Sequence, residues 1–207
     1  MAEPFGIAVL VSGSGTNLQA LIDSVHGDQI EIACVAASRP DAAALERAER
    51  AGIETGVFAG DTLAGREARD AALADWLEGR GVQLVVLAGW MELLGRAFIR
   101  RFAGRIINVH PSLLPAFAGL RAIEQAVEHG VKVTGVTVHF VDEGVDTGAI
   151  VLQEALELSY PDAIADIEKR VHGIEHRLLP RAVRLIAEGR VRLDPANPRV
   201  VLTDDGD

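Results

Sequence analysis

The sequence is poor in cysteines, aromatic residues and basic residues, and each shortage excludes a class of protein. The single cysteine, Cys34, cannot form an internal disulfide. Aromatic residues make up only 4% of a chain that is 49% hydrophobic, so we expect a folded protein with a core of Val, Leu, Ile and Ala. The 20 basic residues face 30 acidic ones, and a net charge of -10 opposes non-specific contact with nucleic acid. We therefore expect no nucleic-acid partner.

Long hydrophobic runs are also missing, because glycines and polar residues interrupt each apolar stretch before it reaches the length of a membrane span. The sequence does not begin with basic residues followed by an apolar run and a small-residue cleavage site, which is the pattern of a secretory signal peptide. We therefore expect a cytoplasmic protein with no membrane partner.

Short apolar segments rich in β-branched residues alternate with segments of helical periodicity. In a chain of 207 residues this pattern predicts a single α/β domain, with a Rossmann-like, mainly parallel twisted sheet flanked by helices. Three consecutive apolar residues, Val85 to Leu87, indicate a central strand covered on both faces. The predicted strands span 5–11, 30–36, 55–58, 83–88 and 105–109, and the predicted helices span 17–26, 42–51, 65–79 and 93–101.

The pattern changes after His110, where a loop with two prolines precedes a predicted helix over 121–129. Two further apolar segments, 133–141 and 149–156, predict an antiparallel hairpin extension. Apolar residues spaced three and four apart predict a long C-terminal helix over 163–188, which Pro180 should bend or interrupt. Residues 1–193 should form the domain, and 194–207 an irregular C-terminal tail.

A glycine-rich turn follows the first predicted strand and leads directly into a helix. Its residues are Gly13, Ser14, Gly15, Thr16 and Asn17. The backbone N–H groups of such a turn and the N-terminus of the helix can bind a phosphate. The turn departs from the dinucleotide fingerprint, because Leu18 stands where the third glycine belongs, and it lacks the lysine of a Walker A loop. The alternative is a plain strand-to-helix turn with Thr16 or Asn17 as N-cap.

The most distinctive segment is Asn-Val-His-Pro-Ser-Leu-Leu-Pro at 108–115, where a predicted parallel strand ends. Strand periodicity places Asn108 and His110 on one side, at the edge where α/β sheets bind ligands. An amide beside an imidazole suits acyl transfer, because Asn can stabilise an oxyanion while His donates to it or handles the proton of an attacking amine. The alternative is a polar pair satisfied by neighbouring loops.

A second polar loop, Asp-Glu-Gly-Val-Asp-Thr-Gly at 142–148, connects the two strands of the predicted hairpin. If the hairpin packs beside the strand of Asn108, Asp146 can approach His110 and raise its basicity; otherwise it is a turn former. The loop lacks the ligand spacing of an EF-hand, and the six scattered histidines and one cysteine form no zinc pattern. We expect no metal.

Taken together, the Gly-Ser-Gly-Thr-Asn turn, the segment at 108–115 and the loop at 142–148 resemble the phosphoribosylglycinamide formyltransferases. The resemblance runs from about residue 5 to residue 190. It implies an enzyme of purine biosynthesis that transfers the formyl group of its co-substrate, 10-formyltetrahydrofolate, to the amine of 5'-phosphoribosylglycinamide. It also implies small-molecule substrates, no nicotinamide or flavin, and a formyltransferase domain over 1–193. A homodimer is compatible with the sequence.

The resemblance further assigns individual residues to three roles. It implies that Asn108, His110 and Asp146 are catalytic, with His139 in support. It places the phosphate of the acceptor on residues 13–17, with Asn17 in direct contact, and the other end of the acceptor on the long helix at His172 and Glu175. The residues implied to bind the formyl folate are Arg66, Trp90, Met91, Glu92, Leu93, Leu94, Asn108, Val141, Asp142, Glu143, Gly144, Val145 and Asp146. Without the resemblance, Met91 and Leu94 would be predicted as ordinary core residues.

The implied mechanism is direct attack of the glycinamide amine on the formyl carbon, with Asn108 and His110 stabilising the oxyanion and Asp146 favouring the imidazolium. Three other functions stay open. A formyltetrahydrofolate deformylase uses water as acceptor and usually carries an extra N-terminal domain. A methionyl-tRNA formyltransferase adds a C-terminal RNA-binding domain, which the acidic charge disfavours. A non-catalytic phosphate- or nucleotide-binding module would need the glycine turn alone.

Overall fold

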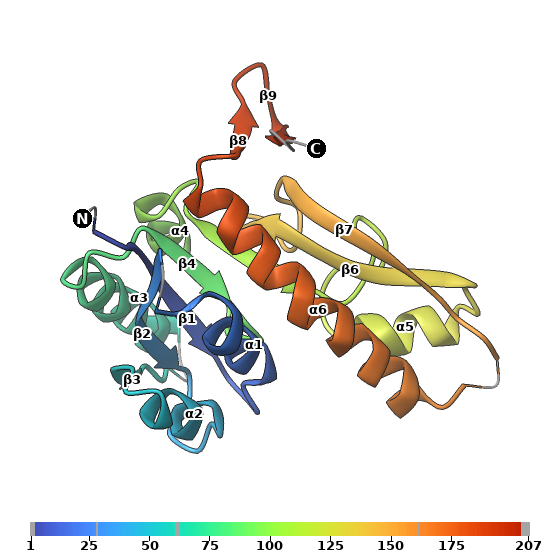
Figure 1. Cartoon of the computed structure of the whole chain (residues 1–207), viewed down its shortest axis with the longest axis horizontal. Helices are drawn as coiled ribbons and strands as arrows, with labels where there is room; N and C mark the ends of the chain where they lie inside the picture. Colours follow the sequence, from blue (N-terminus) through green and yellow to red (C-terminus); the bar gives the residue numbers. More distant parts are fainter. Residues whose placement is uncertain (1–2, 28, 61–62, 161, 204–207) are drawn as a thin grey trace. The chain divides into compact units, whose positions relative to one another are not determined.

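Strands and helices alternate through the first half of the chain, as its periodicity predicts (Figure 1). The computed structural model describes residues 3–27, 29–60, 63–160 and 162–203, and the chain forms two compact units, Met1–Ile107 and Asn108–Asp207. The elements of the first unit are β1 (Phe5–Val11), α1 (Thr16–Val25), β2 (Ile30–Ala37), α2 (Ala44–Arg50), β3 (Thr55–Val57), α3 (Leu63–Glu78), β4 (Leu84–Leu87) and α4 (Arg96–Arg101).

The four strands β3-β2-β1-β4 of the first unit form a parallel sheet in that order. All four residues of β4 are buried, so this strand is covered on both faces, as its consecutive apolar residues predict. The register sets Val11 of β1 beside Ala37 of β2, and Leu10 beside Leu87 of β4. Because the three strands end together, the segments that follow them meet at one edge of the sheet.

The second unit starts within β5 (Ile106–His110) and continues with α5 (Ala122–Glu128), β6 (Val133–Phe140), β7 (Ile150–Glu157), α6 (Ile164–Ala187), β8 (Val191–Asp194) and β9 (Asn197–Thr203). β6 and β7 form the predicted antiparallel hairpin. α6 packs along both strands of this hairpin and buries the apolar side that the sequence predicts (Figure 1). The predicted fold class is confirmed, including the hairpin extension and the long C-terminal helix.

The start of one predicted helix is wrong, and a predicted interruption of another does not occur. α4 begins at Arg96 rather than at residue 93, because side chains of α3 bind the Leu93 carbonyl and the Gly95 N–H and hold 93–95 out of the helix. Pro180 lies inside α6 without interrupting it. A proline removes one backbone hydrogen bond, but Pro180 and its neighbours Leu178 and Leu179 are buried, and this packing keeps the helix continuous.

The predicted irregular tail is also wrong over the residues described. β8 and β9 form a two-stranded antiparallel sheet that pairs Val191 with Thr203 and Asp194 with Asn197. The apolar residues Val200 to Leu202 favour a strand. The prolines and acidic residues on either side of them are typical of an irregular segment, and they led to the wrong prediction. The last residues of the predicted tail, 204–207, lie outside the described residues.

Candidate active site

Four polar side chains of the second unit meet at the end of β5: Asn108, His110, His139 and Asp146. Nδ2 of Asn108 lies 3.3 Å from Nε2 of His139 and 3.5 Å from Oδ1 of Asp146. Asn108 and His110 come from β5, His139 from β6, and Asp146 from the loop after β6. The structure therefore brings together all the residues predicted to be catalytic.

His110 is held between two groups that accept hydrogen bonds. Its Nε2 lies 2.9 Å from the carbonyl oxygen of Phe117, and its Nδ1 lies 3.3 Å from Oδ2 of Asp146. Because a carbonyl oxygen only accepts, Nε2 must carry a hydrogen. With 5% of its surface exposed, the ring is fixed in orientation and its N–H is directed at a carbonyl.

Asp146 reaches the site from a left-handed backbone conformation, with φ 52°. Its Oδ2 accepts a hydrogen bond of 2.8 Å from the backbone N–H of Gly119, a partner that sequence reasoning missed because every non-proline residue has such a group. Asp142, in contrast, is the turn former of this loop: its Oδ1 accepts from Gly144 N at 2.9 Å and from Thr147 Oγ1 at 2.6 Å.

The surroundings of Asp146 favour its charged form. Burial acts to raise the pKa of its carboxyl, but the hydrogen bonds from His139 and Gly119 and the charges of His110 and His139 outweigh burial and hold this pKa below its ordinary value. Oδ2 of Asp146 lies 3.3 Å from Nδ1 of His110, so carboxylate and imidazole form a pair. The pair can therefore stabilise an oxyanion and support proton transfer.

His139 is oriented by its own strand. Its Nδ1 lies 2.8 Å from the carbonyl oxygen of Phe140, which only accepts, so Nδ1 carries a hydrogen. Its Nε2 lies 3.3 Å from Nδ2 of Asn108 and 3.5 Å from Oδ1 of Asp146. His139 is 1% exposed. Through Nε2, this buried ring contacts both the Asn108 amide and the Asp146 carboxylate.

The glycine-rich turn of the first unit connects β1 to α1 through a left-handed glycine. Gly15 is the N-cap of α1 with φ 71°, and no side chain caps the helix, so the alternative with Thr16 or Asn17 as N-cap is wrong. A side chain at residue 15 would overlap with Ala44, whose N–H donates to the Gly13 carbonyl at 3.1 Å. Gly13 and Ser14 are exposed, so their backbone is accessible to a ligand.

The segment predicted to bind folate lies between β4 and α4. Met91 is 71% and Leu93 63% exposed, so Met91 is not the core residue that the sequence would suggest without the resemblance, whereas Trp90 is 8% exposed. Ser12, next to the glycine turn, accepts a hydrogen bond of 2.9 Å from the Met91 N–H through its hydroxyl, and this bond links the two segments of the first unit.

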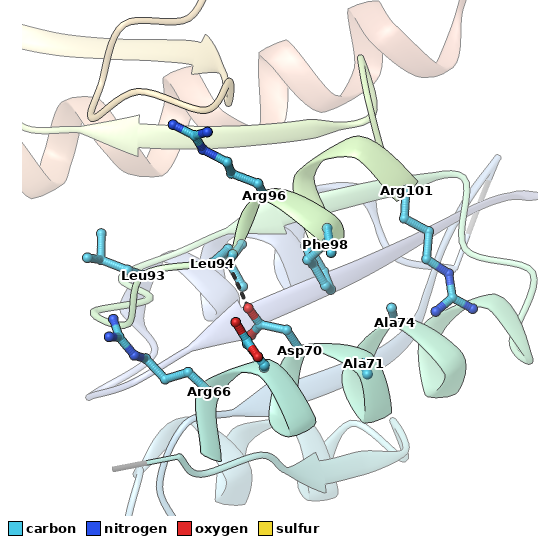
Figure 2. A pocket seen from close by; sticks show the side chains of 12 residues that line it. Arg66, Asp70, Ala71, Ala74, Leu93, Leu94, Arg96, Phe98 and Arg101 are labelled. Carbon is cyan, nitrogen blue, oxygen red and sulfur yellow. Dashed lines mark hydrogen bonds between the residues drawn. The ribbon is translucent and has the colours of Figure 1, made fainter. Parts of the chain in front are cut away.

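A cavity of about 630 Å³ opens beside this segment, between α3 and α4 (Figure 2). Arg66, Leu93 and Leu94 line it, together with Asp70 and Phe98. Three of the predicted folate residues therefore share one pocket, whereas Trp90, Met91 and Glu92 are outside its lining. Apolar walls with a few polar groups suit a small organic ligand.

The remaining predicted residues lie in the second unit. Glu175 is buried in α6, 6% exposed, while His172 is exposed and stacks on His176 with 6.3 Å between ring centroids. Burial and the neighbouring His172 lower the pKa of His176, a residue that the sequence did not single out. In the loop after β6, Val141 is half-buried, and the four residues that follow it are exposed: Asp142, Glu143, Gly144 and Val145.

The described residues contain neither a cluster of metal ligands nor a membrane-spanning helix. Among the described residues, no group of three or more His, Cys, Asp or Glu side chains could hold a metal ion. In the same part of the chain, no helix is both long enough and apolar enough to cross a membrane.

Comparison with known proteins defines the class of protein. The formyl transferase family matches residues 6–183, and the chain belongs to this family. The phosphoribosylglycinamide formyltransferase of Haemophilus influenzae is 45% identical over 189 residues, which cover 90% of this chain and 89% of that protein. The crystal structure of glycinamide ribonucleotide transformylase 1 from Symbiobacterium toebii has a TM-score of 0.92 and 46% identity, and covers 99% of this chain and 96% of that one.

A formyltetrahydrofolate deformylase from Pseudomonas syringae shares the fold at lower sequence identity. Its crystal structure has a TM-score of 0.90 and 27% identity, over 99% of this chain and 67% of that one. The chain is thus more similar in sequence to these two formyltransferases than to this deformylase.

Proposed function

We propose that this chain transfers the formyl group of 10-formyltetrahydrofolate to the amine of 5'-phosphoribosylglycinamide, which yields the N-formyl product and tetrahydrofolate in purine biosynthesis. The observation that carries the proposal is the cluster of Asn108, His110 and Asp146, in which the carboxylate lies 3.5 Å from the Asn108 amide nitrogen and 3.3 Å from Nδ1 of His110. The names of the relatives support the acceptor and the formyl group, and the folate donor is what the resemblance implies.

The reaction begins when the amine nitrogen attacks the formyl carbon and forms a tetrahedral intermediate. Nδ2 of Asn108 and Nε2–H of His110 donate to its oxyanion, which takes the place of the Phe117 carbonyl as acceptor for His110. The bond from carbon to the folate nitrogen then breaks. The proton lost by the amine is delivered to that nitrogen with the help of Asp146, whose carboxylate lies 3.3 Å from Nδ1 of His110.

The substrates occupy the segments that the resemblance assigns. The phosphate of the acceptor binds residues 13–17, where the backbone of Gly13 and Ser14 is exposed and where Nε of Arg47 donates to the Ser14 carbonyl at 2.8 Å. Glu175, with His172 in support, binds the other end of the acceptor. The folate binds Arg66, the segment Trp90–Leu94 and the loop 141–146, with the exposed side chains of Met91, Leu93 and Val145 as apolar contacts.

We also propose the location, partners, cofactors and domain bounds that the resemblance and the composition imply. The enzyme acts in the cytoplasm on small molecules, with no nucleic-acid partner, no metal and no nicotinamide or flavin. Residues 1–193 make up its formyltransferase domain. A homodimer is compatible with this function.

The second candidate function is deformylation of the same folate, with water as acceptor. The structural similarity to a formyltetrahydrofolate deformylase supports this candidate. Folate release by the purified protein, followed spectrophotometrically with and without 5'-phosphoribosylglycinamide, separates the two. Release that requires the acceptor supports the transferase. Release at the same rate in water alone would establish the deformylase.

A further inference from the structure

Arg69 of α3 is a fully buried arginine, and its side chain has no exposed surface. Removing a guanidinium from water is costly unless its N–H groups find partners. In this structure they do. Nε and Nη2 donate to Oδ1 of Asp70, at 2.9 and 2.7 Å. Nη2 also donates to the Leu93 carbonyl at 2.7 Å, and Nη1 donates to Oε2 of Glu92 at 3.2 Å. Two of these four bonds reach the segment after β4.

The same group touches that segment at further points. The guanidinium carbon of Arg69 lies 5.7 Å from the centroid of the Trp90 ring. The second oxygen of its partner, Oδ2 of Asp70, accepts a hydrogen bond of 2.6 Å from the Gly95 N–H, and Figure 2 shows this bond at the wall of the cavity. The Arg69–Asp70 pair therefore contacts residues at both ends and in the middle of 90–95.

This segment needs an external support. It is neither strand nor helix, since β4 ends at Leu87 and α4 begins at Arg96, so its backbone groups cannot be satisfied within an element of their own. It also presents Met91 and Leu93 to solvent, and exposed apolar side chains hold a fixed direction only when the backbone beneath them is fixed.

We propose that Arg69 is a positioning residue for the formyl folate, which holds Trp90–Leu94, together with Asp70, in the conformation that binds this substrate. The inference rests on the proposed function for the identity of the ligand. Arg69 itself touches no substrate, because it is buried behind the segment; it acts through the Leu93 carbonyl, the Glu92 carboxylate and the Trp90 ring.

A control with the same pair of chemical groups, at a more exposed position, is available in the same unit. Arg80, just after α3, also pairs with a carboxylate and stacks on a tryptophan: its Nε donates to Glu54 at 3.0 Å, and its guanidinium lies 4.1 Å from the Trp76 ring centroid. Replacing Arg80 removes an ion pair of the same chemistry without touching the segment 90–95. It shows whether the loss of any arginine–carboxylate pair in this unit alters the segment 90–95.

The experiment compares Arg69→Met, Arg69→Lys and Arg80→Met in the full chain. Hydrogen exchange of residues 90–95 is measured without substrate, and KM for each substrate and kcat are measured in turnover. For Arg69→Met we expect faster exchange in 90–95 and a KM for the folate raised about tenfold or more, the effect of losing a hydrogen bond to a charged group, with KM for the acceptor unchanged. Arg69→Lys should lie between, because it keeps the charge but loses the planar fork.

Unchanged exchange and unchanged folate KM in both Arg69 variants would overturn the inference, as would an equal rise in both KM values or the same changes in Arg80→Met. If Arg69→Met does not fold, Arg69→Lys alone decides by the same criteria. Because the exchange needs no reaction, failure of the two proposals is distinguishable. Absence of folate turnover in the unsubstituted protein counts against the proposed function, and unaltered exchange in the variants counts against the role of Arg69.

Discussion

His110 and Phe117 are joined by a hydrogen bond of 2.9 Å from Nε2 of the imidazole to the backbone carbonyl oxygen. Phe117 has φ 53°, a left-handed conformation that a bulky residue adopts only when its loop imposes it. Since Asp146 faces Nδ1 of the same ring at 3.3 Å, the loop and the carboxylate together aim the N–H of His110 at a carbonyl. The proposed oxyanion role requires this orientation.

Replacing Asp146 by Asn should slow formyl transfer by about 100-fold or more and leave the fold intact, because the site loses a charge but little volume. The measurement is kcat, with the thermal unfolding midpoint as a check on folding. Asp162→Asn is the control, since Asp162 pairs with Arg170 on the same unit. Full activity in Asp146→Asn would show that the assigned proton role is wrong.

The pH dependence of stability should also depend on Asp146. The folded protein holds the pKa of this carboxyl below its ordinary value of 3.8, so the ionised group stabilises the fold above pH 3.8 and this contribution is lost as the pH falls through the lower folded-state pKa. Urea unfolding of the protein and of Asp146→Asn at neutral and at acidic pH measures the effect. The difference in unfolding free energy should shrink below pH 3.8; a difference independent of pH would contradict the prediction.

Gly148→Ala should disrupt the loop that carries Asp146. A Cβ at this position would overlap with the carbonyl oxygen of Phe140, so the hairpin must deform. We expect a lower unfolding midpoint and reduced kcat. Gly173→Ala provides the contrast in stability, because a Cβ there meets nothing within 4 Å and alanine favours a helix interior by about 0.5–1 kcal/mol. Equal stability of the two variants would refute the packing argument.

Gly15→Ala should weaken binding of the acceptor. Alanine would be forced into φ 71°, at a cost of about 1–2 kcal/mol, and its Cβ would overlap with Ala44. The turn must therefore shift, and we expect a higher KM for 5'-phosphoribosylglycinamide with little change in KM for the folate. An unchanged acceptor KM would remove residues 13–17 from the phosphate site.

Strands with a clear apolar pattern can be predicted from the sequence. β1 spans the predicted residues 5–11, and the consecutive apolar residues of β4 reveal a strand with two covered faces. The period of two along β5 also places Asn108 and His110 on one side, where the structure has both beside Asp146. These patterns are local, so one stretch of sequence is enough to read them.

Contacts made by the backbone or by buried charges are hidden from the sequence. The Phe117 carbonyl and the Gly119 N–H complete the site, yet every residue has a carbonyl and nearly every residue an N–H, so no residue type signals them. Arg69 would be expected on a solvated helix face, and only its partners in the fold explain its burial. The approach of Asp146 likewise depends on how the hairpin pairs, which is a long-range property.

Formyl transfer by the cluster around His110 should depend on the acceptor. Tetrahydrofolate release should be followed with purified protein in the presence and absence of 5'-phosphoribosylglycinamide, and with the His110→Ala variant. We predict release only when the acceptor is present and its near-complete loss in the variant. Release that continues without the acceptor would contradict the transferase, and undiminished release by the variant would contradict the role of His110.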